Sequence, residues 1–176
     1  MRHDPFLPVW ARQAQGGGMV LGSVGCFLVI ESRASARARG VEPFAHIAGI
    51  RSDRCPRAPG EATANARAQL AELPGYDPER TAVISSASGV AAATQEEAAL
   101  LAELGLPVRA TASALGHSIE PAFPASLALA ALSVRHGALF PPLEAAEAEM
   151  TGPLRQTLVT GWGHWRGEAL AVVEAA

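Results

Sequence analysis

Residues 18–40 have the sequence GMVLGSVGCFLVIESRASARARG, which gives the first indication of the fold class. The apolar residues at 19–31 include β-branched side chains and lack helical periodicity, which favours a buried strand. Ser32 is a typical helix N-cap and Gly40 a typical helix end, so a short helix is expected between them. The run PFAHIAGI at 43–50 predicts a second strand. The stretch therefore indicates a strand, a helix and a strand in succession.

Helices and strands continue to alternate along the rest of the chain. They are identified from their hydrophobic period, and loops containing glycine or proline separate them. We expect a loop at 51–60, helices at 61–73, 94–104 and 122–135, and strands at 81–85, 106–110, 154–160 and 168–173. This alternation predicts the α/β class, with a mixed sheet and helices packed on its faces. The predicted domain covers residues 18–176, and residues 1–17 remain an unassigned N-terminal segment.

Composition and charge narrow the functional classes. The chain has 176 residues, of which 49% are hydrophobic, so it can form one packed domain but not two ordinary ones. A net charge of -3 and a pI near 5.9 argue against nucleic acid as a partner. All 14 basic residues are arginine, so the chain has no lysine for Schiff-base or general-base chemistry.

Cysteine usage and hydropathy indicate a cytoplasmic chain without a metal site or a membrane span. Cys26 and Cys55 are the only cysteines, and neither has a second cysteine or a histidine at zinc-ligand spacing. We therefore expect two free thiols in a reducing cytoplasm, no metal and no cofactor. The N-terminus lacks a signal-peptide pattern, and the apolar run at 19–30 is too short to span a bilayer.

Four segments, in this order, resemble the second half of a β-ketoacyl synthase. Residues 18–40 resemble the family's glycine-rich strand and following helix, and residues 83–89 fall where the family has an Asn-Ala-His-Gly-Thr loop. TASALGH at 111–117 resembles Thr-Lys-Ser-x-Thr-Gly-His, and residues 127–142 resemble the helix that follows. GWGHWRGEALAVV at 161–173 falls where the family has Phe-Gly-Phe-Gly-Gly-Thr-Asn-Ala. The resemblance implies a thiolase-like fold, of which this chain is the C-terminal half.

The resemblance also implies which residues stand at the family's catalytic positions. Condensing enzymes of this family decarboxylate malonyl-carrier protein and stabilise the developing enolate with imidazole donors, helped by a lysine. Ser88 stands at the first histidine position, Ala112 at the lysine position and His117 at the second histidine position. His117 is the one retained catalytic candidate, and Ser88 and Ala112 are degenerate positions. Losing a single such donor typically lowers the rate about 100-fold to 1000-fold, so one remaining donor does not make an oxyanion site and no useful turnover is expected from this chain alone.

The nucleophilic cysteine of the family lies in the N-terminal half, which is outside the segments that this chain resembles. Cys26 falls at a family glycine position. Cys55 lies beside Arg54 and Arg57, which could lower the pKa of its thiol, but we favour an ordinary solvent-exposed thiol in this loop. Neither cysteine is expected to replace the nucleophile.

The last loop departs from the family's pattern. Trp162, Gly163, His164, Trp165 and Arg166 stand where the family has the gate sequence Phe-Gly-Phe-Gly-Gly. Two glycines are thereby replaced, which changes the conformations open to the backbone. Either this loop forms a reshaped gate for an acyl chain, or its two tryptophans cover the edge of the core.

These departures predict a non-catalytic subunit of chain-length-factor type in fatty acid or polyketide biosynthesis. A half-fold leaves apolar surface and sheet edges to be covered, so the expected partner is a ketosynthase subunit or an N-terminal-half chain. An acyl carrier protein is a further candidate partner. One alternative is a composite 3-oxoacyl-[acyl carrier protein] synthase, an acyltransferase to which this chain contributes His117. Another is a truncated gene remnant.

Overall fold

The computed structural model of the chain describes residues 6–176, which form one mixed sheet with helices around it. The helices are α1 (Val9–Ala14), α2 (Arg33–Ala38), α3 (Glu61–Ala71), α4 (Ala91–Leu104), α5 (Ala112–Leu115) and α6 (Ala122–His136), with a 3-10 turn at Pro78–Arg80. The strands are β1 (Ala45–Asp53), β2 (Thr81–Ser85), β3 (Val108–Ala110), β4 (Gln156–Trp162) and β5 (Glu168–Ala175). Residues 1–5 of the unassigned N-terminal segment lie outside the described residues.

The five strands are ordered β1-β5-β4-β2-β3. Strands β4, β2 and β3 run parallel to one another, whereas β5 runs antiparallel to both β4 and β1. Every residue of β2 is buried, which is typical of a parallel strand covered on both faces. The mixed sheet confirms the predicted α/β class.

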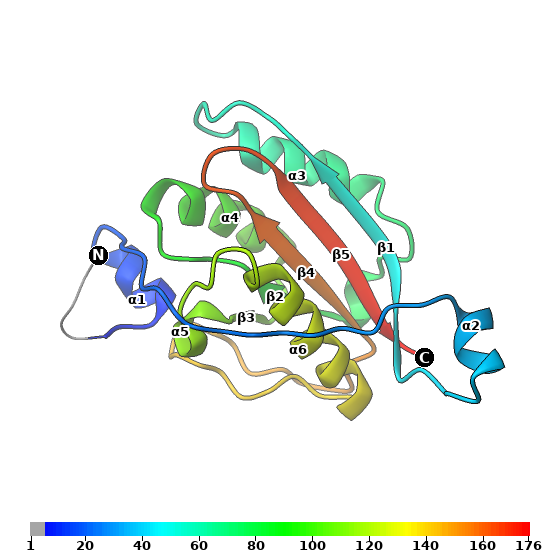
Figure 1. The fold of residues 1–176 in the computed structure, drawn as a ribbon. Coiled ribbons are helices and arrows are strands. Elements are labelled where there is room, and N and C mark those ends of the chain that lie inside the picture. Colours follow the sequence, from blue (N-terminus) through cyan, green and yellow to red (C-terminus); the bar gives the residue numbers. More distant parts are fainter. Residues whose placement is uncertain (1–5) are drawn as a thin grey trace.

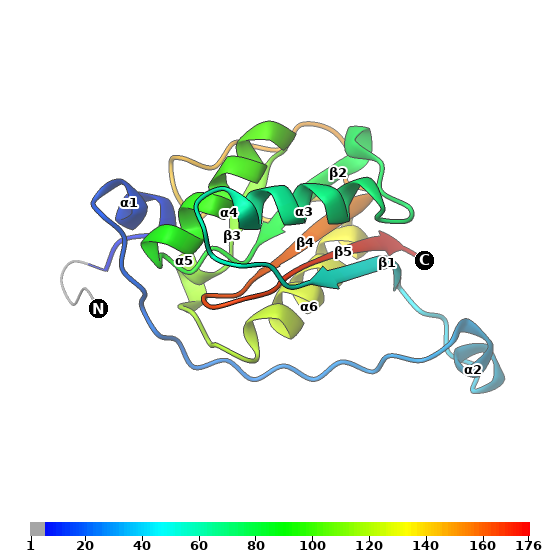
Figure 2. The same ribbon diagram turned by 90° about the horizontal axis from the view of Figure 1, so that it is seen from above.

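Alternate residues of the central strands point to opposite layers of the molecule. Ile84 of β2 packs in one core cluster with Leu127 of α6. Val83, its neighbour along the strand, packs in a second cluster with Leu101 of α4. Figures 1 and 2 show the result from two directions: α6 covers one face of the sheet, and α3 and α4 cover the other.

The predicted strand at 19–31 is wrong. This segment is extended, but its backbone pairs only at Leu21, in a single bridge to His117. Phe27 is 100% exposed and Val29 is 86% exposed. Figures 1 and 2 both place the segment, drawn in blue, on the outer side of α6. The apolar pattern correctly indicates an extended conformation, but a strand also needs a neighbouring strand, and none lies alongside it in the described part of the chain.

Residues 6–17 contain a helix, α1, for which the sequence gives no family pattern. Val9 is fully buried in a small cluster with alanines of the neighbouring loop and of α5. Arg12 is only 1% exposed, and its guanidinium donates to the carbonyl oxygens of Gly18 and Ser88. Helix α1 is therefore fastened to the loop that follows β2.

The other predicted elements are present with shifted ends. Helix α2 begins after Ser32, whose hydroxyl caps it as expected. Helix α4 begins at Ala91 rather than after Thr94. Thr94 lies inside the helix, where its hydroxyl accepts a hydrogen bond from Gly89 N–H. The loop expected from residue 51 begins after Asp53, since β1 pairs with β5 up to that residue. The short helix α5 has no counterpart in the sequence analysis.

Candidate functional site

Three loops meet at the carboxyl ends of the parallel strands: the loop after β2, the turn between α5 and α6, and the β4–β5 hairpin. They bring together Ser88, His117 and His164. The Ser88 hydroxyl is hydrogen-bonded with Nε2 of His164 at 3.0 Å. The ring centroids of His117 and His164 are 5.1 Å apart, with the rings tilted by 43°. In α/β folds this end of the sheet is where ligands usually bind.

The exposed apolar segment fixes the backbone of His117. The N–H of His117 donates to the carbonyl of Val20 at 2.8 Å, and its carbonyl accepts from Gly22 N–H at 3.1 Å. A Cβ at Gly22 would lie 1.8 Å from the carbonyl oxygen of Leu115, so only glycine allows this approach. Gly116, just before the histidine, has a positive φ of 69°. Two glycines thus permit the contact that places His117.

The β4–β5 hairpin turns His164 toward the site. Gly163 N–H donates to the carbonyl of Gly167 at 2.9 Å, and the Arg57 guanidinium donates to the carbonyl of Gly163 at 2.7 Å. A Cβ at Gly163 would lie 2.4 Å from the carbonyl oxygen of Arg166, which again requires glycine. The hairpin therefore holds His164 through backbone contacts on its N-terminal side.

The two tryptophans of the predicted gate loop have different surroundings. Trp162 is 7% exposed and packs against alanines of α3 and a leucine of α4. Trp165 is 88% exposed. Trp162 thus covers the edge of the core, whereas Trp165 does not. His164, which lies between them in the sequence, faces His117. A gate for an acyl chain at this loop stays a prediction.

Both imidazoles lie in a partly dry environment. Burial lowers the pKa of His117, and the neighbouring His164 lowers it further. Burial also lowers the pKa of His164, with a smaller effect from Arg57. Both rings are therefore neutral near pH 7, and each offers one N–H donor. The family resemblance points to only one imidazole here, because His164 reaches the site from a hairpin that is distant in sequence.

A buried carboxylate, Glu97 of α4, supports the loop that carries Ser88. Glu97 is 0% exposed and accepts hydrogen bonds from the Ser85 hydroxyl at 2.7 Å and from the Ser86 N–H at 3.1 Å. The hydroxyl of Thr160 on β4 donates to it as well. Burial raises the pKa of Glu97, and these hydrogen bonds oppose the rise. Glu97 ties the ends of β2 and β4 to α4, a role that its acidic character did not suggest in the sequence.

The remaining candidate residues add no nucleophile. Ala112, at the degenerate lysine position, is buried at the start of α5. Burial raises the pKa of the Cys55 thiol, and so does its hydrogen bond to Glu168 at 3.3 Å. The lowered pKa considered for Cys55 is therefore wrong, and the thiol is half-buried rather than exposed. The Cys26 thiol donates to the carbonyl of Pro124 at 3.4 Å.

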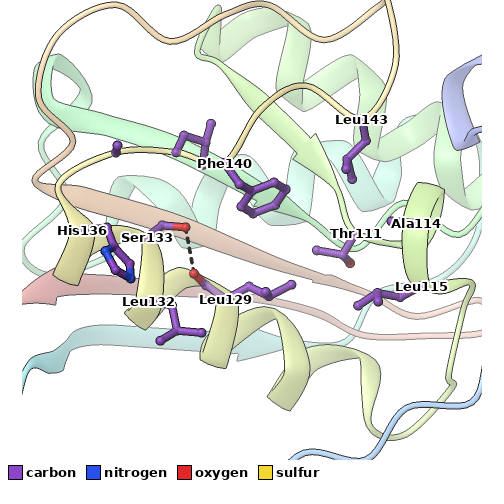
Figure 3. Close-up of a pocket in the computed structure, with 11 residues that line it drawn as sticks. Thr111, Ala114, Leu115, Leu129, Leu132, Ser133, His136, Phe140 and Leu143 are labelled. Atoms are coloured by element: carbon purple, nitrogen blue, oxygen red, sulfur yellow. Dashed lines mark hydrogen bonds between the residues drawn. The ribbon is translucent and has the colours of Figure 1, made fainter.

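An apolar groove of about 560 Å³ lies beside the histidines, between α6, α5 and residues 138–143. Figure 3 shows Leu132 of α6 and Phe140 among the apolar side chains that line it. A second cavity of only about 10 Å³ borders His117, and Leu115 lines both spaces. The groove is therefore the larger apolar space next to the site.

Within residues 6–176, no helix is long and apolar enough to cross a membrane. The same residues contain no group of three or more histidine, cysteine, aspartate and glutamate side chains arranged to hold a metal ion.

Comparisons with known proteins find similarity to ketosynthases. No family model matches the chain. The oxytetracycline polyketide putative beta-ketoacyl synthase 1 of Streptomyces rimosus is 28% identical over 146 residues, which covers 75% of this chain and 34% of that protein. This chain thus spans about a third of the length of the curated relative it matches.

Solved structures of ketosynthases share its fold. The ishigamide ketosynthase/chain length factor matches with a TM-score of 0.73 and 21% identity, over 90% of this chain and 45% of that chain. The ketosynthase from module 6 of the Bacillus subtilis bacillaene synthase matches with a TM-score of 0.68 and 16% identity, over 83% and 33%. A type II polyketide acyl-carrier protein in complex with its hexaketide-bound ketosynthase matches with a TM-score of 0.64 and 18% identity, over 83% and 42%.

Proposed function

We propose that this chain, which has the fold of the C-terminal half of a β-ketoacyl synthase, is a non-catalytic cytoplasmic subunit of chain-length-factor type. It acts in polyketide or fatty acid biosynthesis. Its partner is an active ketosynthase subunit or a chain that supplies the N-terminal half, and an acyl carrier protein is a further partner. One observation carries the proposal: an apolar, strand-like segment lies uncovered on the outer side of α6.

The uncovered strip consists of residues 21–30. Phe27, Val29 and Ile30 are largely exposed in it. Within the described residues, strand pairing reaches the strip only at Leu21. Unpaired backbone amides together with exposed apolar side chains make a template on which a strand of another chain can pair. The strip therefore suits a partner that brings a sheet edge.

Helix α6 is a second surface that suits a partner. Leu127 and Ala130 face the sheet and are buried in the core. Leu129 and Leu132 instead line the apolar groove, and Leu132 is 43% exposed. A helix that is apolar on both sides is typical of a position between two layers. We expect the partner to supply the layer that covers the groove.

The chain's own chemistry supports a non-catalytic role. The pKa of the Cys55 thiol is raised rather than lowered, so this thiol is a weak nucleophile near pH 7. The chain has no lysine, and a buried alanine, Ala112, stands at the degenerate lysine position. Any acyl thioester handled by the complex would be held by the partner's cysteine or by a carrier protein.

Co-purification with a co-expressed ketosynthase from the same organism tests this proposal. We expect a complex of fixed stoichiometry. The double substitution Phe27→Asp and Val29→Asp should weaken it by about 100-fold or more, because two carboxylates would be buried without partners. The free variant should keep its thermal stability, since both side chains are exposed in the isolated chain.

Ala102→Asp is the matched control, because it places the same charge on an exposed position of α4, across the sheet from the strip. This variant should co-purify like the unmodified chain. A soluble free monomer that does not bind the ketosynthase would contradict the proposal. A complex whose affinity is unchanged by the double substitution would contradict it as well.

The facing imidazoles favour a second candidate, a composite synthase. In that reaction a malonyl thioester loses CO2, and the electron pair of the broken carbon–carbon bond remains in an enolate. The enolate attacks the acyl thioester on the partner's cysteine, forms the new carbon–carbon bond and expels the thiolate. The purified complex distinguishes the two candidates. Decarboxylation of malonyl-carrier protein that is lost with His117→Ala favours the composite enzyme, whereas a stable complex without turnover favours the non-catalytic subunit.

A further inference from the structure

We infer that the turn between His117 and Pro121 stores backbone strain in the free chain, and that Ile119 in this turn is a contact for the partner subunit. The inference rests on the proposed function, which supplies the partner. It adds a named side chain to the interface, outside the uncovered strip and on the turn that leads into α6.

Ile119 has an unusual backbone conformation. Within residues 6–176 it is the one residue other than glycine with a positive φ, at 60°. In this left-handed region the Cβ atom lies too close to the following carbonyl oxygen, so mainly glycine and, less often, asparagine or aspartate adopt it. Isoleucine is branched at Cβ, which makes it an outlier there. The turn therefore carries strain at this residue.

Fixed residues on both sides of the turn account for the strain. His117 is held by backbone hydrogen bonds at both its N–H and its carbonyl. Pro121 has a φ of -71°, which its ring restricts, and it is the N-cap of α6. Residues 118–120 must connect these two points, and residue 120 is itself restricted because a proline follows it. We attribute the left-handed conformation of Ile119 to these constraints.

The free chain gains little from an isoleucine in this conformation. Ile119 is 57% exposed, so it contributes only part of the burial that an apolar side chain can give. Glycine or asparagine would adopt the same backbone conformation at lower cost. Strained backbone positions cluster in binding and switch regions. An exposed apolar side chain on a strained residue is therefore better explained by a contact outside this chain than by the fold.

The uncovered strip indicates which partner makes this contact. The strip is joined to the residues before and after the turn. Leu21 forms a bridge with His117, and the Cys26 thiol donates to the carbonyl of Pro124 at 3.4 Å in α6. Figure 2 shows the strip passing along the outer side of α6. A ketosynthase that covers the strip is thus expected to reach Ile119 and to bury its apolar side chain.

Three substitutions at position 119 separate the strain from the contact. Ile119→Val keeps an apolar side chain branched at Cβ. Ile119→Thr keeps the branch but is polar, and Ile119→Asn is polar and tolerates a positive φ. The two polar variants lose similar apolar contacts, so a difference between them reports the strain. In thermal melts, we expect the free Ile119→Asn chain to unfold about 2 to 5 °C above the free Ile119→Thr chain.

Titration of each full-chain variant with the purified ketosynthase measures the contact. We expect Ile119→Val to bind within about threefold of the unmodified chain. Both polar variants should bind about tenfold more weakly or worse, because each brings a polar group to an apolar contact. Ala102→Asp on α4 is again the control and should bind like the unmodified chain.

Equal melting temperatures of the Ile119→Asn and Ile119→Thr chains would overturn the strain. Polar variants that bind the ketosynthase as tightly as the unmodified chain would overturn the contact, while the partner proposal would stand. If the unmodified chain binds no ketosynthase, the contact fails together with the proposed function. The thermal melts need no partner, so they decide the strain in either case.

Discussion

The hydroxyl of Ser88 and the imidazole of His164 form one unit of the site. Ser88 is 3% exposed, so its hydroxyl is held in place and can orient the ring that it contacts. His117 is oriented differently, through backbone hydrogen bonds to Val20 and Gly22. Each imidazole therefore has its own support, and the support of His117 comes from the segment that we expect a partner to cover. We therefore expect partner binding to affect the geometry of His117 through these contacts.

The lowered pKa values of His117 and His164 predict a pH dependence of stability. Protons bind the unfolded histidines near the ordinary pKa of 6.5, and they bind the folded ones only at lower pH. The contribution of the pair is therefore fully present above pH 6.5 and is lost as the pH falls through the folded values. Thermal unfolding of the full chain should show a midpoint that rises between pH 5.5 and pH 7.5. The His117→Gln, His164→Gln double variant should rise less, and an equal rise in both proteins would contradict the prediction.

Three of the site positions could be found from the sequence, whereas their contacts could not. The resemblance points to positions 88, 112 and 117 because each lies in a short motif. The sequence places His164 only in a gate loop, since nothing in a linear sequence shows that a hairpin will turn its imidazole toward His117. Side-chain contacts between loops depend on the register of the sheet, and that register becomes visible only in the folded chain.

At the scale of elements, α4 depends on Glu97 for its attachment to the sheet. Glu97→Ala would leave the hydroxyls of Ser85 and Thr160 and the N–H of Ser86 without their shared acceptor. We expect a loss of about 2 to 4 kcal/mol in the free energy of unfolding, measured by urea denaturation.

Glu103→Ala is the control for Glu97→Ala, because Glu103 lies on the same helix in an exposed ion pair with Arg67. This control should leave stability nearly unchanged, as exposed ion pairs contribute little. Equal effects of the two substitutions would show that Glu97 does not have the structural role assigned to it.

Helices and strands that are marked by a clear hydrophobic period and by end signals can be predicted from the sequence. Elements that depend on contacts with residues distant in the sequence cannot. The strand at β2 and the helices α3 and α6 follow from hydrophobic period and end signals, and their ends differ by few residues from the prediction. Residues 19–31 have the composition of a buried strand, yet no strand pairs with them in the described chain. Helix α1 has only six residues and is held by Arg12, a buried cation that sequence patterns place at the surface.

At the scale of the whole molecule, the layers are incomplete on one side. The sheet is covered by α3 and α4 on one face and by α6 on the other, and the uncovered strip lies beyond α6 (Figure 2). The strip lies on the outer side of α6 (Figure 1), and residues of α6 also line the groove, so we expect one partner to contact both.

Hydrogen exchange of the backbone amides in the uncovered strip tests the need for a partner most directly. In the free chain, the amides of residues 23–30 should exchange almost as fast as in an unfolded peptide, while those of α6 are protected. In the complex with the ketosynthase, the strip amides should slow by about 100-fold or more, because they become paired in a sheet. Strip amides that are already protected in the free chain, or that remain unprotected in the complex, would contradict the account.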